Sequence, residues 1–126
     1  MPQVYTALQS EAKVNGETVE GLQAIEFREQ KSRSDVGAIG TDERVAVVFG
    51  LRIVTGRLRV ASASPALDTL VQSREPFSVT AILRHGDVTR TVAFDECVMD
   101  EKSFLLTAAA HGETVYQFSA TRLREE

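Results

Sequence analysis

Apolar and polar residues alternate along most of the chain between Lys13 and Leu123, and short glycine-containing turns interrupt the alternation. Successive side chains of a β-strand point to opposite faces of the sheet, so a period of two predicts strands with one buried face. The alternation predicts strands at residues 22–30, 44–49, 51–62, 77–83, 88–94, 104–110 and 115–122, and residues 95–99 either continue the sheet or cross to a second one.

Glycines mark the turns between these strands. Asn15-Gly16 suits a type I′ hairpin, which needs positive φ at both central residues. The turns His85-Gly86-Asp87 and His111-Gly112-Glu113 each connect two predicted strands in the same way. Gly56 lies inside a predicted strand, where an isolated glycine indicates a bulge or the close approach of another backbone.

The period changes at Ser64, where a single short helix is predicted. Ser64 is a suitable N-cap and Pro65 suits the first helical position, while the helix ends near Ser73, ahead of Pro76. Its buried stripe consists of Leu67, Leu70 and Val71. We therefore expect an all-β fold, a β-sandwich or partly closed barrel of antiparallel strands with one short flanking α-helix.

The length and composition favour one folded domain over residues 1–126. With 126 residues the chain fits a single compact core, and 43% hydrophobic with 25% charged residues is ordinary globular composition. The formal net charge of −4 argues against a dedicated nucleic-acid binder, which would carry a basic face. It does not exclude a pore through which a polyanion slides without being held, since a mildly acidic wall would suit such a pore.

The polar segment Lys31–Glu43 is the longest between predicted strands, and we interpret it as a protruding loop or arm. A loop of this length is uncommon in a small domain and indicates either function or disorder. Val36 and Ile39 are apolar although their position exposes them, which favours docking on a partner. The alternative is a mobile hairpin tip.

The sequence offers few parts for catalysis or metal binding. His85 and His111 are its only histidines, and each stands before a glycine in a predicted turn, where a solvated side chain is expected. No phosphate-binding loop, calcium loop or nucleophile elbow is present. Cys97 is the only cysteine and lies in an apolar run, so we expect a buried, inert thiol. We predict no enzyme, no cofactor and no metal site.

The N-terminal residues lack the basic and apolar regions of a signal peptide, and no apolar run approaches the roughly 20 residues that span a bilayer. We therefore expect a soluble protein without membrane contact. Its many arginines stand beside acidic residues, and they form either surface ion pairs or subunit contacts.

The order of these elements carries a resemblance. A glycine-turn hairpin precedes the strand Gly21–Arg28, and the arm ends in Ile39-Gly40-Thr41-Asp42-Glu43-Arg44. A strand containing Gly56-Arg57-Leu58-Arg59-Val60, the helix 64–73 and the closing strand Tyr116–Ala120 complete the order. From about Asn15 onward the chain resembles the tail-tube proteins of phages and related contractile injection systems.

The resemblance implies a structural virion protein that forms rings, usually of six subunits, which stack into a hollow tube for DNA or an effector. It implies that the arm contacts a neighbouring subunit or the next ring through Lys31, Arg33, Asp35, Val36, Ile39, Asp42, Glu43 and Arg44. It also implies a polar face toward the lumen or an interface, with Glu26, Arg28 and Gln30.

The partners implied are other copies of the chain, with sheath, baseplate or tail-terminator proteins, and cargo that passes without specific binding. The location implied is the tail of a virion or phage-like particle, assembled in the host cytoplasm. Two alternatives stay open: a β-sandwich binding module, and a baseplate or tube-initiator adaptor of the same kind of particle.

Overall fold

A computed structural model describes residues 5, 9–108 and 110–125. Within that part it has eight strands and one helix. They are β1 (Glu11–Val14), β2 (Glu17–Thr18), β3 (Leu22–Val36), β4 (Ala46–Ala61), α1 (Pro65–Ser73), β5 (Phe77–His85), β6 (Val88–Leu105), β7 (Glu113–Ala120) and β8 (Arg122–Glu125).

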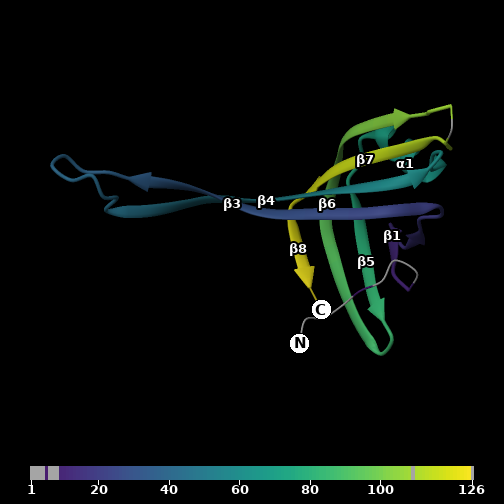
Figure 1. The fold of residues 1–126 in the computed structure, drawn as a ribbon, viewed down its shortest axis with the longest axis horizontal. Helices are drawn as coiled ribbons and strands as arrows, with labels where there is room; N and C mark the ends of the chain where they lie inside the picture. The colour runs from purple at the N-terminus through teal and green to yellow at the C-terminus, as the bar shows by residue number, and fades with distance from the viewer. Residues whose placement is uncertain (1–4, 6–8, 109, 126) are drawn as a thin grey trace.

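All strand pairs are antiparallel, and the order across the sheet is β2-β1-β5-β6-β7-β4-β3, with β8 pairing with β6. The sheet has two halves, one with β1, β2, β5 and β8 and the other with β3, β4 and β7. The long strand β6 belongs to both: its first part pairs with β5 and β8, and its last part, from Val98 to Leu105, pairs with β7. The all-β prediction with one short helix is confirmed. The two halves belong to one continuous sheet that does not close into a barrel (Figure 1).

The sheet bends where β6 passes from one half to the other. Phe94 pairs with Val79 and Cys97 pairs with Phe77, so the β6 ladder contains an irregularity between these pairs. Glu96 lies there with φ of 51°, in the left-handed region. An extra residue in one strand bends it and increases its twist, so this irregularity folds the two halves toward each other.

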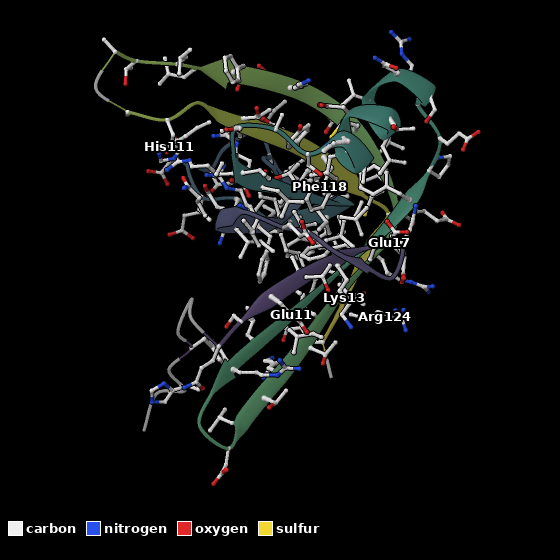
Figure 2. All side chains as sticks on the ribbon, turned by 90° about the vertical axis from the view of Figure 1, so that its right-hand side faces the viewer. Glu11, Lys13, Glu17, His111, Phe118 and Arg124 are labelled. Carbon is white, nitrogen blue, oxygen red and sulfur yellow. The ribbon has the colours of Figure 1, made fainter. Side chains whose placement is uncertain are left out.

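The core lies between the two halves of the sheet. Phe118 of β7 contacts Phe94 of β6 edge-to-face, with ring centroids 5.5 Å apart, and Phe77 of β5 with centroids 6.1 Å apart. Phe27 of β3 contacts the Phe94 ring at 5.4 Å. Figure 2 shows Phe118 among the side chains gathered between the halves. Because these rings come from both halves, they join the sheet into one domain.

Gly56 is buried beneath this aromatic cluster. It pairs regularly with Phe27 on one side and Phe118 on the other, so the predicted bulge is absent at Gly56. The close approach comes from a side chain, since an added Cβ would lie 2.4 Å from Cζ of Phe118. The extra residue in β4 lies at Gly50 and Leu51, opposite Ser32.

The helix is capped and anchored as its sequence predicts. Ser64 is the N-cap, and its side chain accepts a hydrogen bond from the Leu67 backbone N–H at 3.5 Å. Leu67 is fully buried. Tyr116 donates its hydroxyl hydrogen to Asp68 at 2.7 Å, and burial raises the pKa of this tyrosine to about 12, with the carboxylate adding to the effect. These contacts hold α1 against β6 and β7.

The turn and strand predictions have different outcomes. The Asn15-Gly16 turn is confirmed, with φ of 51° and 84°, and so is the β5–β6 hairpin. The strand predicted over residues 104–110 is wrong in its bounds, because β6 ends at Leu105. The predicted strands 44–49 and 51–62 form the single strand β4. Within the described residues, the helix found is too short to cross a membrane.

Cys97 is fully buried, as predicted, and burial raises the pKa of its thiol to about 12. A thiol is reactive as the thiolate, so little of the reactive form is present at neutral pH. We expect no reaction with Ellman's reagent at pH 8 in the native protein, and one thiol per chain after denaturation in urea. Rapid native labelling would contradict this burial.

Candidate functional site

Strands β3 and β4 extend beyond the core as a long two-stranded hairpin (Figure 1). The pairing continues from Glu29 opposite Val54 to Val36 opposite Ala46, and the connecting loop covers residues 37–45. Except for half-buried Val47, every residue from 26 to 53 is exposed. Residues 30–53 of this hairpin are called the arm below. It makes no contribution to the buried core.

The predicted loop Lys31–Glu43 is therefore a strand over its first part. Its predicted bounds are wrong because β3 continues to residue 36 in the ladder with β4. The backbone groups form this ladder, so polar side chains do not prevent it. Of the predicted contact residues, Lys31, Arg33, Asp35 and Val36 lie on β3, and Ile39, Asp42, Glu43 and Arg44 lie in the loop. Ile39 is fully exposed at the tip.

The two faces of the arm differ in chemistry. Directly opposed residues of a ladder share a face, and alternate residues of one strand share a face. One face is mainly charged: Glu29 pairs with Arg52 at 3.3 Å, and the ammonium group of Lys31 lies 5.4 Å from the centre of the Phe49 ring. In the loop, Arg44 pairs with Asp35 at 3.2 Å.

The opposite face carries large apolar side chains, and we call these the apolar stripe. They are exposed by 39%, 57%, 83% and 47% at Val36, Val48, Leu51 and Ile53, respectively. Sequence analysis identified only Val36 of this set. An exposed row of this kind on a two-stranded hairpin is typical of a surface that another chain covers.

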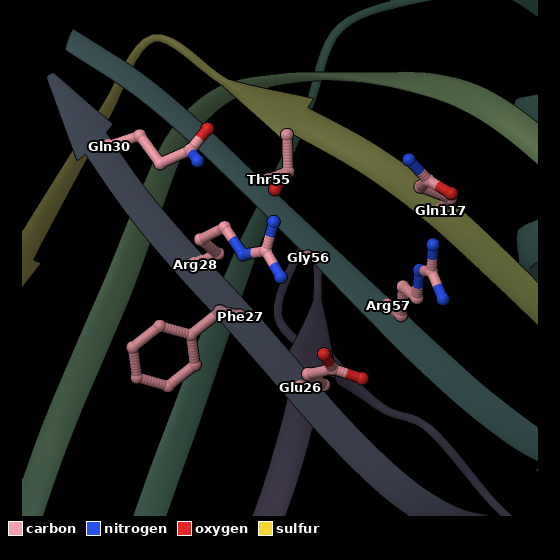
Figure 3. A pocket seen from close by; sticks show the side chains of 8 residues that line it. All are labelled: Glu26, Phe27, Arg28, Gln30, Thr55, Gly56, Arg57 and Gln117. Carbon is pink, nitrogen blue, oxygen red and sulfur yellow. The ribbon is translucent and has the colours of Figure 1, made fainter. Parts of the chain in front are cut away.

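The same face continues onto the body of the sheet, where it is polar. The ladder aligns Glu26, Arg57, Gln117 and Glu101 in one row across β3, β4, β7 and β6. The next row contains Arg28, Thr55 and Ser119 and ends in Val98, which is exposed. We call this face the polar wall. The predicted polar residues Glu26, Arg28 and Gln30 all line a shallow hollow of about 290 Å³ in it (Figure 3).

The polar wall contains charges of both signs. Arg28, Arg57 and Arg59 are interleaved with the carboxylates of Glu26, Glu101 and Glu113, according to the register. Arg59 lies 3.8 Å from Glu113. In the hollow, the guanidinium groups of Arg28 and Arg57 and the carboxylate of Glu26 surround Gly56 (Figure 3). The wall is hydrophilic but has no strong net charge.

The part of the domain outside the arm is called the body. Four of its strands, in the order β6-β7-β4-β3, form a sheet with two open edges. In the described residues, β3 pairs on one side only, with β4, and residues 98–105 of β6 pair on one side only, with β7. Adjacent strands are antiparallel throughout, so β3 and β6 run in opposite directions. Open edges present unpaired backbone groups that can pair with another chain.

The two histidines lie in different turns. His85 ends β5, and His111 precedes β7, where its Nε2 lies 3.5 Å from Glu113 and 3.0 Å from the amide nitrogen of Gln23. Among the described residues, no three histidine, cysteine or acidic side chains are grouped to hold a metal ion.

No protein-family model matches the chain, and no curated protein resembles it in sequence. Its fold, however, is similar to solved structures. A chain in the tube-terminating cap of the anti-feeding prophage has a TM-score of 0.72 and 10% identity, with 100% of this chain and 93% of that chain covered.

Two other structures have similar scores. A chain of the sheath-tube complex of an extracellular contractile injection system, PVC, has a TM-score of 0.71 and 12% identity, covering 98% of this chain and 91% of that one. The SPP1 tail tube has a TM-score of 0.74 and 7% identity, covering 98% and 79%. The chain therefore has the fold found in tail tubes and related injection systems, and the resemblance noted in the sequence is confirmed at the level of fold.

Proposed function

We propose that this protein is a structural subunit that forms rings and that the rings stack into a hollow tube. The observation that carries the proposal is the four-stranded sheet β6-β7-β4-β3, which has an open edge on each side and exposes the polar wall. If β3 of one copy pairs with residues 98–105 of β6 in the next, the antiparallel alternation continues from copy to copy. Such a head-to-tail contact generates a closed ring when its rotation closes.

The polar wall then faces the lumen. A closed sheet has an inner and an outer face, and the apolar face of this sheet is already covered by the other half of the domain. The polar wall is the face left for solvent, and its balanced charges neither hold nor repel a passing polyanion or protein strongly. We assign the lumen a passive role as a conduit, and the protein no catalytic role.

The ring is proposed to contain six subunits. Among the similar structures, the tail of a gene transfer agent is described with C6 symmetry and the anti-feeding prophage baseplate as six-fold symmetrised. The location proposed is a phage tail or phage-like particle assembled in a host cytoplasm, with sheath, baseplate or terminator proteins as neighbours.

A ring-only role is the second candidate, because the similar structures include a tube-terminating cap and a sheath/tube terminator. A terminator would form one ring and stop. The apolar stripe of the arm favours repeated stacking, since a stacking copy would cover it.

Electron microscopy and sedimentation velocity of the purified chain over a range of concentrations test the proposal. Hollow rings, with stacked tubes at higher concentration, are the expected result. Rings that never stack would favour the terminator role. A monomer at every concentration and salt would overturn the proposal.

A further inference from the structure

An exposed aromatic side chain lies on each open edge of the sheet β6-β7-β4-β3. Phe27 on β3 is 36% exposed and Phe104 on β6 is 58% exposed. Phe27 contacts the core ring of Phe94, and Phe104 is opposed to the buried Thr114, so both lie on the face opposite the polar wall. An added Cβ at Gly112 would lie 2.9 Å from the Phe104 ring, so the returning chain supports this ring at the edge.

Each ring has a charged residue two positions away on the same face. Glu29 lies 3.3 Å from Arg52, and Lys102 lies 2.5 Å from Asp68. The side chains of Glu29 and Lys102 nevertheless remain partly exposed. The β3 edge thus presents an aromatic ring and a carboxylate, and the β6 edge presents an aromatic ring and an ammonium group.

A closed ring restricts which residues of two copies can meet. Within one copy the ladders place Ala24 level with Ser103 across the four strands. Strands about 4.8 Å apart make this sheet about 19 Å wide, and strands of closed sheets tilt by roughly 35–45° from the axis. Because neighbouring copies stand at the same height, the next copy is displaced along the strands by about 13–19 Å, or about four to six residues.

Two further conditions restrict the register. A displacement toward the end of β3 places all of the open edge 98–105 opposite β3, whereas the reverse leaves at least half of that edge beyond Leu22, where β3 begins. Side chains alternate between the faces, so only an even displacement keeps each face continuous from copy to copy. The displacement is therefore either about four or about six residues.

Charge decides between these two registers. The larger displacement would place Lys31 opposite Lys102, and like charges directly opposite each other destabilise a sheet. The smaller displacement places Phe104 opposite Phe27. It also places Lys102 opposite Glu29, so an aromatic pair and an ion pair form side by side. We propose that these two pairs join neighbouring copies and set the register of the ring, an inference that rests on the proposed function.

Disulfide cross-linking tests the register directly. The proposed displacement places Ser103 opposite Arg28, so the double variant Arg28→Cys, Ser103→Cys should link neighbouring copies into a ladder of multimers on oxidation. Within one chain the two positions lie on strands about 14 Å apart, too far for a disulfide. Arg28→Cys with Leu105→Cys tests the larger displacement, and Arg28→Cys with Glu101→Cys tests a smaller one. Rings that either of these pairs links, or that the Ser103 pair does not link, would overturn the register.

Two charge changes test the two edges separately. Phe104→Asp impairs the β6 edge, and Glu29→Lys impairs the β3 edge because the new side chain would face Lys102 of the next copy. Both side chains are exposed in a single copy, so the fold is retained. Each variant alone is expected to raise the concentration needed for rings by about tenfold or more. Val88→Asp is the matched control, since Val88 is 40% exposed at the β5–β6 turn, and it is expected to form rings as the wild type does.

A mixture of the two variants gives the sharpest result. Each supplies the intact edge that the other lacks, so sedimentation velocity should find dimers that grow no further. Rings at the wild-type concentration from both single variants would overturn this inference and leave the proposed function intact. A wild-type chain that forms no rings would overturn the proposed function instead.

Discussion

Gly56→Ala is expected to lower the free energy of unfolding by about 3 kcal/mol, although alanine is ordinarily the better residue in a strand. The added Cβ would lie 2.4, 2.8 and 2.9 Å from three atoms of the Phe118 ring. That ring is fully buried and contacts Phe77 and Phe94, so it has no free space to move into. Urea unfolding followed by circular dichroism measures the change.

Gly37→Ala is the matched control. Nothing lies within 4 Å of the position that its Cβ would take, and its φ is not in the left-handed region. Its stability is expected to stay within about 0.5 kcal/mol of the wild type. Combining Gly56→Ala with Phe118→Leu should cost less than the sum of the two single changes, because the smaller side chain vacates part of the space. A Gly56→Ala protein as stable as the wild type would contradict the packing described for the core.

The sequence correctly predicted the elements whose conformation depends only on neighbouring residues. The helix start at Ser64 and Pro65 follows from capping and a fixed proline φ, and both act within one turn. The Asn15-Gly16 turn follows from the positive φ that these residues tolerate. Neither needs information from the rest of the chain.

The arm strands could not be predicted in the same way. Period-two alternation arises when one face of a strand is buried, and residues 31–35 are exposed on both faces. Their sequence, Lys-Ser-Arg-Ser-Asp, therefore reads as a polar loop. The bend in β6 was equally hidden, because Glu96 adopts positive φ without being a residue that favours it.

Part of the candidate site did carry a signal that the alternation obscured. The segment 46–53 is apolar on both faces over much of its length, although it pairs only with the polar part of β3 there. A strand with two apolar faces is ordinarily buried on both. Here the segment is exposed on both faces, so its apolar residues indicate that another chain covers it. The charged residues of the arm gave no such indication.

Removing the arm is expected to leave the domain folded and to abolish tubes. Lys31 and Arg52 are directly opposed in the ladder, so replacing residues 32–51 with Asn-Gly lets a two-residue turn close the shortened hairpin. The chain already contains this arrangement, since Asn15-Gly16 connects the opposed pair Val14 and Glu17. No residue of the buried core lies between 32 and 51, so the melting temperature should change by only a few degrees.

Assembly, in contrast, depends on what the excision removes. Three of the four side chains of the apolar stripe and the whole tip are lost, while both open edges remain. Under the proposed function, electron microscopy and sedimentation velocity should therefore find monomers or single rings for the shortened chain and tubes for the wild type. Replacing Gly86-Asp87 with the same Asn-Gly between the opposed pair His85 and Val88 is the matched control, and this variant should still form tubes. Tubes of unchanged repeat from the shortened chain would mean that ring stacking uses the edges of the body alone and that the arm serves another partner.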